Sequence, residues 1–158
     1  MGVVLARIDQ RLVHGIVVTQ VTKACNAQRI MVVDEEVSQD ETQKAVMRMS
    51  KPAGTGMSII NLETAIANFA KGRYDNHNVL VLVNEPDTLV KMVEGGIKIP
   101  KVHVGIVFEK DDRVAVTKHV ALNDKEKNDL KRLEELGVEV TFQYTPSDKE
   151  EPLSQYVK

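Results

Sequence analysis

The feature that most constrains the fold of this chain is a continuous apolar run, Val79-Leu80-Val81-Leu82-Val83. A strand with apolar side chains on both faces needs cover on both faces, which is typical of a central strand in a parallel sheet. Shorter runs of the same character predict further strands at Val3–Ile8, Arg29–Val33, Met57–Ile60, Val102–Val107, Val114–Val116 and Val138–Phe142.

Amphipathic segments separate these runs and predict helices at Gly15–Ala24, Ser38–Ser50, Leu62–Phe69, Asp87–Glu94 and Asp124–Leu136. The alternation predicts βαβ units and one α/β domain over residues 1–158, with an open, mainly parallel β-sheet and helices on both faces. In the second helix we expect Val46 and Met49 to face the core, and Ser38 or Asp40 to cap the N-terminus. The tail after Pro146 is expected to be a short helix or irregular.

Composition excludes several classes of protein. The 21 basic and 23 acidic side chains nearly balance, whereas a general nucleic-acid binder should carry a basic surplus. The single cysteine, Cys25, excludes an intramolecular disulfide and is expected to be a small core residue. No apolar run approaches the roughly 18 residues of a membrane span. We therefore expect a cytoplasmic protein whose membrane role, if any, comes through a partner.

The loop after the first strand carries most of the candidate chemistry. It reads Arg7-Ile8-Asp9-Gln10-Arg11-Leu12-Val13-His14-Gly15. Arg7, Asp9 and Arg11 alternate, so an extended chain would place them on one side. His14 and Gly15 fall near a helix N-terminus, where unpaired N–H groups and a partial positive charge bind phosphate readily.

These residue types suit a phosphoryl site. A neutral histidine is a competent nucleophile near pH 7, and arginines can pair bidentately with phosphoryl oxygens. Asp9 could orient the imidazole or cap the helix, and the spacing does not choose between the two roles. The competing interpretation is a structural Arg–Asp ion pair beside a structural histidine.

Metal and nucleotide sites lack support in the sequence. The histidines have no HxxH, HxxxH or HExxH spacing, and no GxxxxGK[ST] or GxGxxG motif is present. His77, His103 and His119 are expected to be structural or solvated. No metal and no cofactor are therefore predicted.

The segment from Ala6 to Gly15 resembles the signature R-I-D-x-R-L-[IV]-H-G of a known family. That family comprises the IIB components of the mannose/fructose/sorbose class of the bacterial sugar phosphotransferase system. The likeness continues at Ile30–Val37, Leu89–Gly96 and Val102–Gly105. Two departures stand out, because Val21 replaces a frequent tryptophan and Ile106-Val107 follows Gly105.

The resemblance implies an open, mainly parallel sheet and a phosphoryl relay. His14 would accept a phosphoryl group from the phosphohistidine of a IIA component and pass it to a sugar handled by membrane IIC and IID components. Arg7, Arg11 and Gly15 would bind the phosphoryl group, and Asp9 would orient or cap. The protein would be cytoplasmic and peripherally associated with the membrane through IIC and IID.

Two alternatives belong to other functional classes. A regulatory module could dock IIA without relaying phosphate, and a sugar-phosphate lyase could use Asp34, Glu35 or Glu85 as a further acid or base. The sequence does not specify the sugar, the phosphorylated imidazole nitrogen or the oligomeric state.

Overall fold

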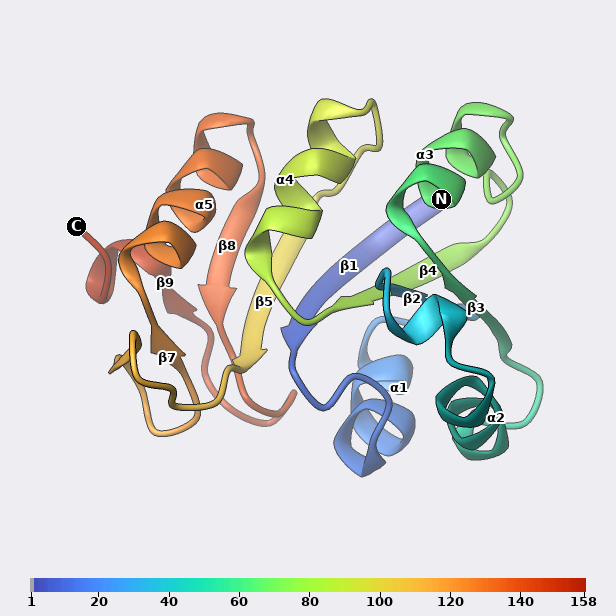
Figure 1. The fold of residues 1–158 in the computed structure, drawn as a ribbon, viewed down its shortest axis with the longest axis horizontal. Helices are drawn as coiled ribbons and strands as arrows, with labels where there is room; N and C mark the ends of the chain where they lie inside the picture. The colour runs from blue at the N-terminus through green and yellow to red at the C-terminus, as the bar shows by residue number, and fades with distance from the viewer. Residues whose placement is uncertain (1) are drawn as a thin grey trace.

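Seven strands form one twisted sheet in the order β3-β2-β4-β1-β5-β8-β9 (Figure 1). The computed structural model describes residues 2–158. The strands of this sheet are β1 (Gly2–Asp9), β2 (Arg29–Val33), β3 (Gly56–Ile60), β4 (Asn78–Val83), β5 (Lys101–Ile106), β8 (Glu139–Phe142) and β9 (Glu151–Pro152). Every pairing is parallel except that of β8 with β9. The predicted open, mainly parallel sheet is confirmed.

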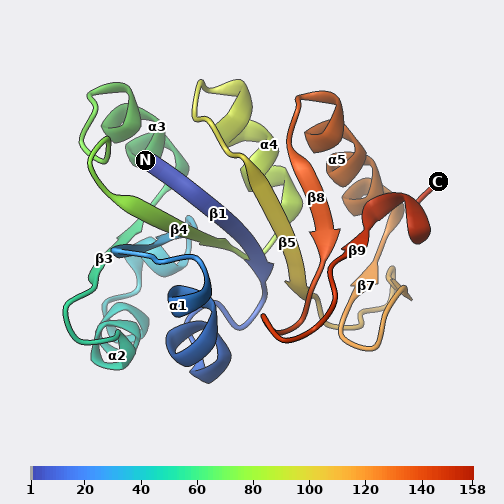
Figure 2. The ribbon, with the colours of Figure 1, turned by 180° about the vertical axis from the view of Figure 1, so that it is seen from behind.

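Helices cover both faces of the sheet, as predicted (Figures 1 and 2). The helical elements are a π-helical turn (Val17–Val21), α1 (Thr22–Ala24), a 3-10 turn (Val37–Gln39), α2 (Glu41–Ser50), α3 (Leu62–Ala70), α4 (Pro86–Glu94), α5 (Asp124–Glu135) and a second 3-10 turn (Leu153–Gln155). The helices α3, α4 and α5 lie on one face, and α1 and α2 lie on the other. No helix among residues 2–158 is long and apolar enough to cross a membrane.

Strand β4 separates two hydrophobic cores. Val79, Val81 and Val83 point into the core beneath α3 and α4, whereas Leu80 and Leu82 point into the core beneath α1 and α2. All five side chains are fully buried. The continuous apolar run is therefore explained by cover on both faces.

The phase of α2 differs from the prediction. Val46 and Met49 are 59% and 86% exposed, and Met47 is the residue that packs against the core. Asp40, one of the two predicted caps, has an extended backbone and caps α2 by accepting from the Gln43 N–H, so that prediction is confirmed. Met47 is the buried residue of α2, which lies beside the edge strand β3, so this helix turns a narrow stripe to the core.

The strand predicted near Val114 does not join the main sheet. It forms β6 (Val114–Ala115), which pairs antiparallel with β7 (Ala121–Leu122) in a separate two-stranded ribbon. This ribbon extends from the end of β5 and leads into α5. It therefore lies at the edge of the sheet where parallel strands end, which is where open α/β sheets bind ligands.

Candidate functional site

The candidate loop lies where β1 ends between β4 and β5. The Gln10 N–H donates to the Ile106 carbonyl at 3.0 Å, and the Leu12 N–H donates to the Asp9 carbonyl at 2.9 Å. Leu12 has a φ of 54° and buries its side chain in the core beneath α1. Such a left-handed conformation is costly for leucine, so burial and the turn hold it. The helical backbone then begins at residue 15 and passes through a π-helical turn, a feature frequent at functional sites.

The Asp9 carboxylate gathers three groups of the loop. Its Oδ2 lies 2.6 Å from His14 Nε2 and 2.9 Å from Arg7 Nε, and its Oδ1 accepts from the Arg11 N–H at 2.9 Å. Asp9 is fully buried. Burial raises its pKa, but the hydrogen bond from His14 and the charge of Arg7 lower it, and the net pKa is below the usual value. Asp9 is therefore an ionised carboxylate near neutral pH.

This geometry fixes the tautomer of a neutral His14. An ionised carboxylate only accepts hydrogen bonds, so Nε2 must carry the proton that it shares with Asp9. Among the described residues, no hydrogen bond occupies Nδ1 of His14. The lone pair of Nδ1 is then available to a reacting group, although the side chain as a whole is only 7% exposed.

Arg7 lies behind Asp9 rather than beside solvent. Its side chain is fully buried, and its three guanidinium nitrogens donate to the Asp9 carboxylate and to the carbonyls of Gln143 and Tyr144. The guanidinium crosses β5 at Gly105, where a Cβ atom would come within 2.4 Å of Arg7 Cζ. Glycine at this position is required by that crossing.

Arg11 and Gly15, the other two predicted phosphoryl-binding residues, are exposed. A Cβ at Gly15 would have nothing within 4 Å, so the backbone there is open to approach. Arg11 lines a cavity of 290 Å³ with Phe108, His119 and Tyr144 among its other walls. The loop thus presents a cation that lines a cavity and, at Gly15, an open stretch of backbone.

Sequence reasoning missed the residues that complete this site from distant segments. The backbone carbonyls of Gln143 and Tyr144 accept hydrogen bonds from Arg7, and backbone carbonyls have no sequence signature. The rings of His119 and Tyr144 stack at 3.5 Å with an interplanar angle of 10°. Of these residues, only Gly105 lies in a segment that carries the family resemblance. Its role, to leave room for the Arg7 guanidinium, becomes visible only once the path of the Arg7 side chain is known.

The acidic residues of the lyase alternative lie in a separate hollow. Asp34, Glu35 and Glu85 line a cavity of 300 Å³ that shares no lining residue with the one beside Arg11. Both carboxylate oxygens of Asp34 are engaged, one by Asn84 and the other by the Val37 N–H. Among residues 2–158 no group of three or more His, Cys, Asp or Glu side chains could hold a metal ion.

Comparison with known proteins supports the family resemblance. Residues 3–158 match the model of the sorbose subfamily of phosphotransferase-system IIB components. The chain belongs to this family. A sorbose-specific EIIB component of Klebsiella pneumoniae is 32% identical over 94% of this chain and 90% of that protein. The crystal structure of the IIB domain of the Klebsiella pneumoniae sorbose permease aligns with a TM-score of 0.94 over 99% of this chain and 96% of that one, at 30% identity.

Other relatives of this IIB component act in different sugar systems. A fructose-specific EIIB component of Bacillus subtilis is 30% identical over the whole chain and 97% of that protein. A mannose-specific EIIAB component of Escherichia coli is 32% identical, and 94% of this chain spans 46% of its length. Family membership implies sugar phosphotransferase activity together with a IIA component, a membrane IIC component and a sugar.

Proposed function

We propose that this IIB component is a phosphoryl carrier in which His14 takes a phosphoryl group from phospho-IIA and passes it to a sugar during uptake through IIC and IID. The observation that carries the proposal is the 2.6 Å contact between Asp9 Oδ2 and His14 Nε2. With Nε2 bonded to Asp9, the nucleophile would be Nδ1, and the negative charge of Asp9 would lie on the opposite side of the ring from it. In this proposal the chain works in the cytoplasm and meets the membrane through IIC and IID.

The proposed transfer is a displacement at phosphorus. The lone pair of His14 Nδ1 forms a bond to phosphorus while the N–P bond of the donor phosphohistidine breaks, and the donor imidazole keeps the bonding electron pair. The proton on Nε2 stays in its hydrogen bond to Asp9, whose charge stabilises the positive charge that develops on the ring. The step requires neither a metal nor a cofactor.

The cationic groups have two different roles in this proposal. Arg11 is exposed, lines the cavity and would pair with the phosphoryl oxygens, with the open backbone at Gly15 as a second point of approach. Arg7 would act from behind, because its donors already hold Asp9 and the carbonyls of the 143–144 segment. Phosphoryl binding by Arg7 would require it to give up these partners.

Transfer of labelled phosphate tests the proposal. Phosphoenolpyruvate, Enzyme I, the histidine carrier protein and a family IIA would be mixed with wild type, His14→Ala or His77→Ala. We expect acid-labile, base-stable label on wild type and on His77→Ala, and none on His14→Ala. Absence of label on wild type while IIA is labelled would refute the relay and favour a regulatory module.

A further inference from the structure

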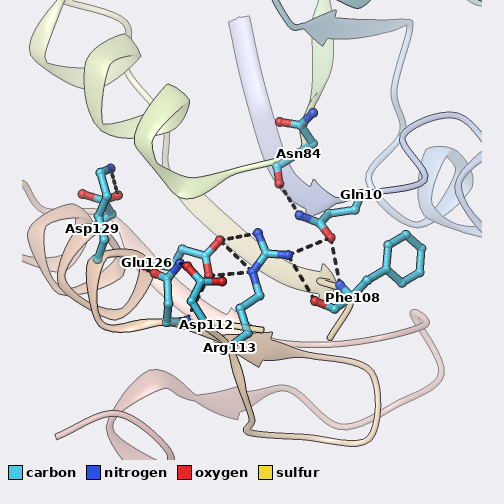
Figure 3. Close-up of polar contacts among 9 residues, drawn as sticks. Gln10, Asn84, Phe108, Asp112, Arg113, Glu126 and Asp129 are labelled. Carbon is cyan, nitrogen blue, oxygen red and sulfur yellow. Dashed lines mark hydrogen bonds and ion pairs between the residues drawn. The ribbon is translucent and has the colours of Figure 1, made fainter. Parts of the chain in front are cut away.

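A side-chain clamp ties the candidate loop to the segment after β5 (Figure 3). Gln10 is at its centre, because its Oε1 accepts from the Phe108 N–H at 2.9 Å and its Nε2 donates to the Asn84 carbonyl at 3.3 Å. Arg113 Nη1 approaches the same Oε1 at 3.4 Å. One amide thus links the end of β1 to the segments that follow β4 and β5.

Arg113 is itself fixed from the opposite side. Its Nε and Nη2 donate to Glu126 at 2.9 and 2.8 Å, in a pair whose side chains are only 11% and 8% exposed. Glu126 is held in turn by the capping box that it forms with Asn123 at the start of α5. Such a forked pair of largely buried groups has little freedom to rearrange. We call Gln10, Arg113 and Glu126 the clamp.

The clamp holds both backbone polar groups of Phe108. The N–H donates to Gln10, and the carbonyl accepts from Arg113 Nη1 at 3.1 Å. The ring nevertheless points away from the clamp, and the residue is 51% exposed (Figure 3). Phe108 is therefore a half-exposed aromatic side chain on a backbone whose N–H and carbonyl are both held by the clamp.

The position of Phe108 sets it apart from the other large exposed apolar residues. Those identified in residues 2–158 are Val46, Met49, Phe108 and Val114. Of the four, Phe108 alone lines the cavity beside Arg11. A single exposed apolar residue is ordinary on a protein surface. Aromatic side chains, phenylalanine included, are enriched at protein interfaces, and a preorganised backbone lowers the entropic cost of binding there.

We propose that Phe108 is the docking anchor for the IIA component and that the clamp preorganises it. This inference rests on the proposed function, because IIA is the partner that brings a phosphohistidine to His14. A carrier must bind and release its donor in every cycle, so a modest interface with one aromatic anchor suits the task. Arg11, on the same cavity, would meet the anionic phosphoryl group of the donor.

Calorimetric binding of an unphosphorylated IIA component from a sorbose-class system tests the anchor. We expect Phe108→Ala to raise the dissociation constant about tenfold. Met49→Ala, which removes a side chain from a site 86% exposed on α2, is the matched control and should leave the constant unchanged. Equal effects of the two variants, or unchanged binding by Phe108→Ala, would overturn the proposal.

A double-variant cycle tests the clamp. Arg113→Met should weaken IIA binding in the wild-type background, because it frees the backbone that positions the Phe108 ring. It should add little in the Phe108→Ala background, where that ring is already absent. Arg113→Lys, which keeps the charge but loses the fork, should weaken binding nearly as much as Arg113→Met if Arg113 acts by position. Thermal unfolding of each variant identifies a change that merely destabilises the fold. Fully additive effects of Arg113→Met and Phe108→Ala would refute preorganisation.

Kinetics separate docking from the relay. Phe108→Ala should raise the IIA concentration needed for half-maximal labelling about tenfold and leave the saturated rate unchanged. If IIA binds through Phe108 but wild type takes no label, docking stands and the relay fails. If labelling by IIA is unaffected while sugar phosphorylation in IIC/IID vesicles falls, Phe108 serves the membrane components and the proposal is overturned.

Discussion

At the scale of single residues, Asp9 answers a question that the spacing left open. Orienting the imidazole and capping the helix were the alternatives in the sequence. The carboxylate contacts His14 Nε2 with one oxygen, and the other accepts from the Arg11 N–H in the turn that precedes the helical backbone, rather than capping the helix. Sequence could place a carboxylate near a histidine. It could not show which ring nitrogen the carboxylate meets, because that depends on the left-handed turn at Leu12.

The hydrogen bond from His14 Nε2 to Asp9 predicts the behaviour of Asp9→Asn. The asparagine side chain can present either a donor or an acceptor to Nε2, so it no longer selects the tautomer with a free Nδ1. We expect the rate of phosphoryl transfer from IIA to fall by up to roughly four orders of magnitude, the loss seen when the orienting aspartate of a serine-protease triad becomes asparagine. Rapid-quench labelling measures that rate. A loss below tenfold would contradict the proposed role of Asp9.

The close approach of Arg7 to β5 predicts the effect of Gly105→Ala. The added Cβ would lie 2.4 Å from Arg7 Cζ, so the guanidinium must shift and loosen Asp9. We expect the free energy of unfolding in urea to fall by about 1–3 kcal/mol, as for other overpacked sites. Gly15→Ala, where the new Cβ meets nothing within 4 Å, is the control for stability alone. Comparable losses in both variants would refute the steric explanation.

At the scale of elements, strands were easier to predict than helix phase. The apolar run in β4 has apolar side chains on both faces, so it can only be a central strand that is covered on both sides. The second helix was placed correctly, with Asp40 as one of its two predicted caps, but its phase was wrong, because Met47 faces the core in place of Val46 and Met49. The clamp between Gln10 and Arg113 escaped prediction altogether. Its partners are 103 positions apart, and no local pattern links them.

The observed phase of α2 predicts opposite results at neighbouring methionines. Met47 packs against the core beneath α1 and α2, so Met47→Ala should lower the free energy of unfolding by about 2–5 kcal/mol. Met49 is 86% exposed, so Met49→Ala should change it by no more than about 0.5 kcal/mol. Urea denaturation followed by circular dichroism measures both. A larger loss of stability in Met49→Ala than in Met47→Ala would contradict the observed phase and support the one predicted from the sequence.

At the scale of the whole molecule, the C-terminal segment closes the site. The carbonyls of Gln143 and Tyr144 receive Arg7, and the same segment ends at Glu150. Glu150 Oε1 accepts from Lys101 Nζ at 2.7 Å and lies 2.6 Å from His103 Nε2, both on β5. Burial lowers the pKa of His103, so a neutral imidazole donates to the carboxylate. One end of this segment is thus bonded to Arg7 of β1, which in turn donates to Asp9, and the other end is bonded to β5.

This attachment predicts an acid-dependent contribution to stability. Hydrogen bonds from Lys101 and His103 lower the pKa of Glu150 to about 2. A carboxyl whose pKa is depressed by folding stabilises the native state above its unfolded value, and that contribution is lost as pH falls through the folded value. The free energy of unfolding of Glu150→Gln should therefore lie below that of wild type at pH 7. The gap should close as pH falls from about 4.5 to about 2.

The size of the gap is limited by solvent. The Glu150 side chain is 36% exposed, so we expect no more than about 1 kcal/mol at pH 7 in low salt. Urea titrations of both proteins at several pH values measure the gap, and Glu109→Gln, at an exposed carboxylate in the segment after β5, is the control. A gap that stays constant from pH 7 to pH 2 would mean that Glu150 acts through packing rather than charge. In that case acid would not loosen the segment that receives Arg7.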